Sequence, residues 1–384
     1  MRSSLLPLLA LLPGLALASP ENLLAIHNPV QAPSGSELKF EASAFAGNDL
    51  YAAHRLADEW ANPPDTRPGR NLAVGHARAE LSAGYGGFSV SSFKRFDGFG
   101  TATRDAVNFY YGSQQPDSLL ARPGTLDLRY GFTGFSASGV RLGWSGQVQE
   151  KLRVGFSLNL MKAGILRQER IKGTATVSGG VGTVAGTRTL LYTGLDYTPA
   201  AEANINDFSP YAQSTTDKGQ GRSLDLGMQW DLRPDLHLTL IANDLLGQLS
   251  WKQVPELTQN FNDANWPLEF NVPGSTAKIT GTNRYRDYTL HLKPKLSSSL
   301  RWDAADTWGV DGGFATRAGV FLPEAGAFWR WADAGIARLS YEPRFGSLGL
   351  GLGYGPFFVE GRTDRTNLNN AHTVGLQAGV ALRF

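Results

Sequence analysis

The chain has 384 residues and no cysteine, which excludes disulfide bonds, thiolate nucleophiles and cysteine-ligated metal sites. Its formal net charge is +2, so no strongly basic face argues for a nucleic-acid partner. Charged residues make up 18% of the chain, below the usual quarter of a soluble domain, and glycine is abundant at 45 residues. This composition fits either a secreted soluble protein or one large closed sheet.

Residues 1–18 have the pattern of a signal peptide. Arg2 supplies the positive charge, residues 5–17 form an apolar run, and residues 16–18 read Ala-Leu-Ala, which is a cleavage site. The apolar run is too short for a membrane anchor, which must cross about 30 Å of hydrocarbon. We therefore expect the mature chain to begin at Ser19. No later segment approaches about 20 apolar residues, so the sequence predicts no transmembrane helix.

Residues 19–70 alternate poorly between apolar and polar side chains, except over residues 38–45. Residues 49–60 have a helix-like pattern, and residues 62–69 are rich in proline. We predict that this segment is an N-terminal plug inside a barrel or a periplasmic arm. A flexible linker is the alternative.

Residues 71–384 contain many segments in which apolar and polar residues alternate, as they do in strands with one face on an apolar phase. Counted in chain order they give an even number of about fourteen strands, in the range of 12 to 16, because residues 187–197 and 278–284 could be added. The fourteen segments are residues 77–85, 88–96, 126–135, 140–148, 152–167, 223–230, 236–251, 288–302, 308–320, 327–331, 336–341, 348–354, 357–362 and 372–384. Pro294 would remove a ladder hydrogen bond, so we expect a bulge or an opening in the wall there.

Residues 221–251 read GRSLDLGMQWDLRPDLHLTLIANDLLGQLSW. This strand–turn–strand pattern resembles the long-chain fatty-acid transporter superfamily of outer-membrane barrels, which includes conjugal-transfer TraF-type proteins. Asn28-Pro29 is similar to the N-terminal Asn-Pro motif of that superfamily, with Val30 where an alanine is usual. The resemblance implies a barrel with an N-terminal plug, in which extracellular loops capture apolar ligands that then pass through the wall when the plug moves. Candidate capture residues are Phe208, Tyr211, Phe261, Trp266 and Phe270; in the alternative, these side chains only pack the loops together.

The last strand alone does not separate a barrel from a soluble β-sandwich, whose strands also alternate, but together with the signal peptide and the strand-end aromatics it favours the barrel. From Val374 to Phe384 every second residue is apolar, and the chain ends on this aromatic, as in the signal that outer-membrane insertion machinery reads. Aromatics near other strand ends would form the girdles of a barrel: Trp230, Trp251, Trp302, Trp308, Trp331 and Tyr354. We therefore predict an all-β transmembrane antiparallel barrel in the outer membrane of a Gram-negative bacterium.

Charged residues of the predicted wall must face the lumen, because Lys or Arg facing lipid near the midplane costs about 2–4 kcal/mol. They could bias permeation by charge, or they could simply pair with one another. His291, Lys293, Lys295 and Arg301 form a basic row without evident acidic partners, which would suit a carboxylate or phosphate headgroup. The predicted lumen-lining residues are Arg78, Glu80, Asp127, Arg129, Arg141, Asp225, His291, Lys293, Lys295, Arg301, Asp311 and Arg317.

The six histidines have no convincing serine and carboxylate partners, and no spacing suggests a metal site, so we predict neither catalysis nor a cofactor. The favoured function is a monomeric channel or transporter for small hydrophobic molecules. Its other partners would be outer-membrane lipid and the insertion machinery. The alternative is a structural component of an envelope machine for conjugation or secretion, in which the barrel is an anchor.

Overall fold

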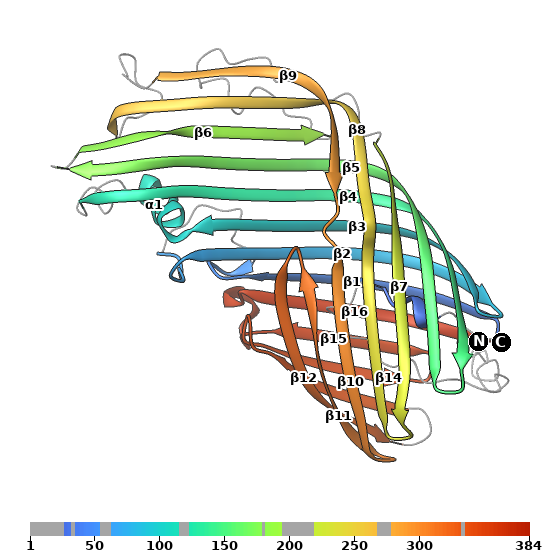
Figure 1. Ribbon diagram of the computed structural model, residues 1–384. Helices are drawn as coiled ribbons and strands as arrows, with labels where there is room; N and C mark the ends of the chain where they lie inside the picture. The colour runs from blue at the N-terminus through green and yellow to red at the C-terminus, as the bar shows by residue number, and fades with distance from the viewer. Residues whose placement is uncertain are drawn as a thin grey trace, which may run out of the picture.

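The structure, a computed structural model, describes residues 27–31, 35–53, 63–114, 123–178, 181–193, 219–266, 278–331 and 335–384. Within these ranges the chain forms sixteen strands in one antiparallel sheet, with one α-helix and two short 3-10 helices (Figure 1). No helix in these ranges is long and apolar enough to cross a bilayer. Because residues 1–26 lie outside them, the signal peptide remains a prediction.

The elements are η2 (Pro29–Gln31), β1 (Glu37–Asn48), β2 (Arg70–Tyr85), β3 (Phe88–Thr103), α1 (Arg104–Gln114), β4 (Gly124–Gln149), β5 (Leu152–Ser178), β6 (Val181–Thr193), β7 (Gly219–Arg233), β8 (Leu236–Trp266), β9 (Lys278–His291), β10 (Lys295–Ala305), β11 (Trp308–Arg317), β12 (Val320–Trp331), β13 (Gly335–Glu342), β14 (Ser347–Tyr354), β15 (Phe357–Thr363), η5 (Leu368–Asn370) and β16 (Thr373–Arg383).

The sheet closes into a barrel of fourteen wall strands. The last strand, β16, pairs with the first, β1, from Glu37↔Arg383 to Gly47↔Thr373. The other closing contacts are those of β5 with β7, β7 with β8, and β8 with β10. Every wall strand therefore has two neighbours, so the barrel wall has no open edge for another chain to pair with.

Two positions in the wall are each occupied by two shorter strands in succession, so the sixteen strands form a wall of fourteen positions. β6 and β7 pair with successive parts of β5, because Leu166 pairs with Thr193 and Ala163 pairs with Gly219. In the same way, β9 and β10 pair with successive parts of β8. Pro294 lies in the break between β9 and β10, where the sequence predicts a bulge or an opening. Of the two optional segments, residues 187–193 lie in β6 and residues 278–284 in β9, while residues 194–197 lie outside the described residues.

The outer face of the barrel is apolar, and aromatic side chains ring one end of it. Large hydrophobic side chains on this face alternate with buried lumen residues, as in β14, where Leu348, Leu350 and Leu352 are about half exposed. Five predicted girdle aromatics, each between 42% and 65% exposed, lie beside the short turns: Trp230, Trp302, Trp308, Trp331 and Tyr354. Short turns mark the periplasmic end of such barrels, so the opposite end is extracellular.

Trp251 does not belong to the girdle, contrary to the prediction, because it is only 2% exposed. The predicted strand stops at this residue, whereas β8 continues to Trp266. Trp251 therefore lies within the wall, where its indole points inward and donates a hydrogen bond from Nε1 to the Gly164 carbonyl at 2.8 Å.

The wall is much taller on one side than on the other. β5 and β8 have 27 and 31 residues, whereas β13, β14 and β15 have 8, 8 and 7. Figure 1 shows β4, β5, β6, β8 and β9 projecting far beyond β14 and β15 at the extracellular end. The tall half therefore extends past any hydrocarbon layer that the short half can span.

Two predictions about the wall were wrong. Glu37–Asn48 is the wall strand β1, so the barrel starts within the segment predicted to be a plug or arm, at Glu37 rather than at residue 71. The segments 126–135 and 140–148 are one strand, β4, because the chain continues through Ser136, which pairs with Phe96 of β3, and makes no turn. The irregularity lies in β5, where Gly164 and Ile165 are opposite the single residue Ser136. These two errors offset each other, and the strand number of about fourteen is confirmed.

Candidate functional site: the barrel lumen

A cavity of about 480 Å³, here called the lumen cavity, lies inside the barrel toward the extracellular end. Its upper wall is apolar, and its floor consists of ionisable side chains. The apolar lining comprises Val74, Phe99, Phe132, Phe135, Tyr288, Leu290 and Leu292, and the floor comprises His76, Arg95, Asp97, Asp244, Lys295 and Arg317. An apolar concave wall with a few convergent polar groups is the usual form of a small-molecule site.

The floor is organised by Asp244, which is 1% exposed. Its carboxylate accepts two hydrogen bonds from Arg95, at 2.7 and 2.8 Å, and lies 3.0 Å from Lys295 Nζ. Asp97 completes the cluster, accepting from Arg95 Nε and Lys295 Nζ at 2.7 Å each. Paired hydrogen bonds between charged groups of this kind are strong and hold a fixed geometry.

Asp244 reaches the lumen because β8 is irregular at this level. Asp244 and Leu246 have positive φ angles of 60° and 51°, which L residues adopt at a cost. Two register shifts of β8 against β7 accompany them, between Arg222 and Leu224 and between Leu224 and Leu226 on β7. Asn243 and Asp244 are therefore both buried although they are adjacent, while Leu246 is 87% exposed.

Below the floor, ion pairs and hydrogen bonds fill the side of the lumen formed by β2 to β7. Arg141 Nη1 donates to Glu80 at 2.6 and 2.7 Å, and Arg78 also pairs with Glu80. Arg141 Nε donates to Asn159 at 2.6 Å, and Asn159 donates to Asp225 at 2.9 Å. The lumen charges at this level are therefore paired with one another.

A second ion network lies on the C-terminal side of the lumen. Arg338 donates to Asp311 from Nε at 2.9 Å and also pairs with Glu324. Arg362, which is 3% exposed, pairs with Glu324 and with Glu360. Beside this network, a vestibule of about 400 Å³ lies toward the periplasmic end; Asn28, Gln31, Arg301, Asp311 and Arg338 are among its lining residues.

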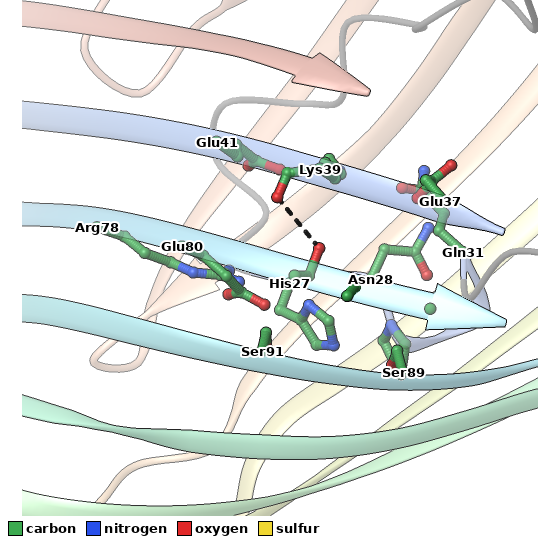
Figure 2. A pocket seen from close by; sticks show the side chains of 14 residues that line it. His27, Asn28, Gln31, Glu37, Lys39, Glu41, Arg78, Glu80, Ser89 and Ser91 are labelled. Atoms are coloured by element: carbon green, nitrogen blue, oxygen red, sulfur yellow. Dashed lines mark hydrogen bonds and ion pairs between the residues drawn. The ribbon is translucent and has the colours of Figure 1, made fainter. Parts of the chain in front are cut away.

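The segment from His27 to Gln31 lies inside the barrel, where η2 packs on β4, β5 and β7. Figure 2 shows His27, Asn28 and Gln31 close to the inner faces of β1 to β3, around a pocket of about 50 Å³. Asn28 Oδ1 accepts a hydrogen bond from the Val30 amide at 3.1 Å, which fixes the turn. The wall holds the segment through Asn243, which donates to the His27 carbonyl at 3.0 Å, and through Ser157, 3.2 Å from His27 Nε2.

Two paired glycines provide the seat of this turn. Gly155 on β5 and Gly227 on β7 are cross-strand partners. A Cβ on Gly155 would lie 2.2 Å from the Pro29 carbonyl oxygen, and one on Gly227 would lie 2.6 Å from Val30 Cγ2. Any larger residue at either position would displace the turn.

The extracellular mouth of the lumen is a second cavity of about 660 Å³ with several cations. It shares Arg70, Thr101, Gly131 and Arg170 with the lumen cavity, so the two are contiguous. Lys172 also lines the mouth. Arg70, Arg170 and Lys172 are exposed, and none has an ion pair within the described ranges.

The predicted lumen residues all lie along this inner surface, at different levels. Arg317, Lys295, His291 and Lys293 line the lumen cavity, while Arg301 and Asp311 line the vestibule. Arg78, Glu80, Arg141 and Asp225 belong to the lower ion network, and Asp127 and Arg129 pair with each other at the mouth. The prediction of a basic row without acidic partners was wrong for Lys295, which is paired with Asp97 and Asp244, and for Arg301, which is paired with Asp303. His291 and Lys293 have no ion pair within the described ranges.

The predicted capture residues are only partly placed. Phe208, Tyr211 and Phe270 lie outside the described residues, and Trp266 is the last residue of β8. Phe261 is partly buried and packs against the cluster of Leu128, Ala175 and Val184. Its contacts therefore agree with the packing alternative. The terminal Phe384 is 73% exposed, and its amide donates to the Ser36 carbonyl at 3.0 Å.

The sequence reasoning missed the central ion cluster and the glycine seat. Arg95 lies in a predicted strand, and the rule that placed Arg78 in the lumen would have found it. Asp244 could not be assigned to a face, because the irregular backbone of β8 interrupts alternation around it. Gly155 and Gly227 carry no signal in the sequence apart from lying on the inward side of their strands.

Comparisons with known proteins agree with this architecture. The sequence matches no protein-family model and no curated protein sequence. The fold is similar to that of the ΔS2S3 mutant of TodX, a monoaromatic hydrocarbon channel, with a TM-score of 0.50, 12% identity and 94% of each chain covered. The two proteins share a β-barrel fold.

Two further solved structures have lower scores. The toluene transporter TodX of P. putida has a TM-score of 0.48 and 12% identity, covering 94% of this chain and 93% of its own. A FadL homologue of Pseudomonas aeruginosa has a TM-score of 0.27 and 9% identity, covering 90% and 89%. The similarity to the TodX mutant, at a TM-score of 0.50, agrees with the predicted antiparallel barrel fold. The closed barrel with its apolar outer face places the protein in the outer membrane of a Gram-negative bacterium.

Proposed function

We propose that the protein is a monomeric, non-enzymatic channel that admits small hydrophobic molecules through the outer membrane. The observation that carries the proposal is the lumen cavity, whose wall includes four aromatic rings and whose volume is about 480 Å³. This volume falls within the roughly 300–1,000 Å³ that is typical of small-molecule sites. The similar fold of a monoaromatic hydrocarbon channel also supports the proposal that the ligand is a small hydrophobic molecule.

The cavity has one open route and one closed route. It is contiguous with the mouth, so a ligand can enter from the extracellular side. Toward the periplasm, the two ion networks and the turn at Pro29–Gln31 occupy the lumen. We infer that transport requires the turn to leave its glycine seat, or the ligand to leave sideways at the break between β9 and β10. Leu292, in that break, lines the cavity.

The proposal is tested by filling the cavity. Val74→Trp adds an indole on the inner face, whereas Val90→Trp adds the same group on the lipid face, where Val90 is 49% exposed. We expect cells producing Val74→Trp to take up labelled toluene more slowly than wild type, and cells producing Val90→Trp to match wild type. If wild-type cells take up toluene no faster than cells without the barrel, the proposal is wrong.

The second candidate function, an anchor in an envelope machine, is favoured by the filled lower lumen. A machine component needs no continuous path, and the ion pairs around Arg141 and Arg338 occupy part of the lower lumen. Its test is cross-linking in native membranes followed by mass spectrometry. A stable protein partner together with absent uptake would support the anchor, whereas uptake without such a partner would exclude it.

A further inference from the structure

The floor of the lumen cavity has one more cation than it has carboxylates. Asp97 and Asp244 are both engaged by Arg95 and Lys295, so these four charges balance. Arg317 also lines the cavity, is only 4% exposed, and has no ion pair within the described ranges. Its Nε and Nη2 atoms are buried without hydrogen-bond partners. A buried, unpaired guanidinium is costly unless another molecule pairs with it.

His76 adds a second unsatisfied group to the same floor. It is 6% exposed, and neither ring nitrogen has a hydrogen-bond partner. The ring stacks on Phe45 with a centroid distance of 5.8 Å, so its position is fixed. Arg317 and His76 thus offer several N–H donors at the bottom of the cavity, below its apolar upper wall.

The approach to the floor is also cationic and aromatic. Arg70 and Arg170 stand where the mouth meets the cavity, both exposed and without ion pairs in the described part of the chain. Cationic side chains outnumber the two carboxylates, Asp105 and Asp127, in the lining of the mouth, and such an excess of one charge attracts ligands of the opposite sign. Below them, Phe99, Phe135 and Tyr288 present rings to the cavity, and rings prefer other rings in offset or edge-to-face contact.

We propose that the ligand of the lumen cavity is an aromatic monocarboxylic acid whose carboxylate binds Arg317 and His76 while its ring packs among Phe99, Phe135 and Tyr288. The proposal rests on the channel function above and narrows its ligand class. A neutral arene fills the apolar part but leaves the Arg317 guanidinium unpaired. A carboxylate satisfies it with charge-assisted hydrogen bonds. A rigid ring also loses less conformational freedom on binding than a flexible alkyl chain does.

The test measures binding to the full-length mature barrel in lipid nanodiscs by isothermal titration calorimetry. The probes are 1-naphthoate, its neutral isostere 1-naphthamide, and decanoate. We expect naphthoate to bind about tenfold or more tightly than naphthamide, because a charged hydrogen bond is worth about 1.5–3 kcal/mol. Decanoate should bind more weakly than naphthoate.

Three variants test whether Arg317 itself binds the carboxylate or whether the loss of any positive charge has the same effect. Arg317→Met should weaken naphthoate binding about tenfold and leave naphthamide within about twofold. Arg317→Lys should restore part of the naphthoate affinity. Lys94→Met removes one positive charge from the lipid-facing side of β3 and should change nothing. Each variant is first shown to be folded by its mobility on electrophoresis before and after boiling.

The outcomes distinguish this inference from the channel proposal. Equal affinity for naphthoate and naphthamide would show that the ligand need not be a carboxylic acid, and would not affect the proposal that the protein is a channel. If decanoate binds more tightly than naphthoate, and Arg317→Met abolishes decanoate binding, the claim that the ligand is aromatic is wrong. Failure of all three probes to bind, together with no toluene uptake, would overturn the channel proposal and this inference with it.

Discussion

Substitution of Gly155 by alanine should unseat the turn at Pro29–Gln31 and open the barrel. The added Cβ would lie 2.2 Å from the Pro29 carbonyl oxygen, 2.6 Å from its carbon and 3.0 Å from the Val30 nitrogen. These are backbone atoms, which cannot rotate away as a flexible side chain can. The turn must therefore retreat by roughly 1 Å to reach ordinary van der Waals separation.

The magnitude follows from what holds the turn in place. Val30 is 2% exposed, and burying a valine side chain is worth about 1.5–3 kcal/mol. The hydrogen bonds of the His27 carbonyl with Asn243 and of the His27 ring with Ser157 add about 0.5–1.5 kcal/mol each. Loss of about 3 kcal/mol of this total would raise the undocked fraction, meaning the fraction of molecules in which the turn has left Gly155 and Gly227, roughly a hundredfold.

Single-channel conductance in planar bilayers measures the undocked fraction. We expect Gly155→Ala to open more often or for longer than wild type. Gly361→Ala is the matched control, because a Cβ there meets no atom within 4 Å. If folded Gly155→Ala has the conductance of wild type, the turn does not close the channel.

Three further predictions concern the wall and its charges. Asp244→Asn should lower the free energy of unfolding in urea by about 3–5 kcal/mol, because it leaves buried cations uncompensated, whereas Asp235→Asn, in an exposed pair with Arg233, should cost about 1 kcal/mol or less. Pro294→Ala should reduce toluene uptake if ligands leave through the break between β9 and β10, and unchanged uptake would exclude that exit. Deletion of Phe384 should lower the amount of folded barrel in outer-membrane fractions, and an unaltered amount would count against its role as an insertion signal.

Strand alternation was sufficient to predict the barrel and its closure. The regular pattern of Leu376, Val380 and Leu382 follows directly from side chains that alternate between lipid and lumen. Alternation failed for β4, where residues 134–139 read GFSASG and resemble a turn in composition although the strand continues through them. Residues 38–45 also alternate in the sequence, but the pairing of β1 with β16 is what identifies this segment as wall and not as plug.

The candidate site was less predictable, because its contacts join residues that are far apart in the sequence. Arg95 and Asp244 are 149 residues apart, and Lys295 and Asp97 are 198 apart. Alternation could assign Arg317 and Lys295 to the lumen, but it could not say that Lys295 is neutralised and Arg317 is not. That difference depends on strand stagger around the barrel, which sets the level of each side chain.

The two wall positions that are each occupied by two successive strands have a consequence for how this wall can change. In each, the chain leaves the ladder and later rejoins it beside the same neighbour, β5 in one case and β8 in the other. Extra residues can therefore be inserted between β6 and β7 or between β9 and β10 without changing the number of strands around the barrel. Each doubling of such an insert adds only about 0.6 kcal/mol of loop-closure cost, so these two points are where grafted recognition segments should be tolerated.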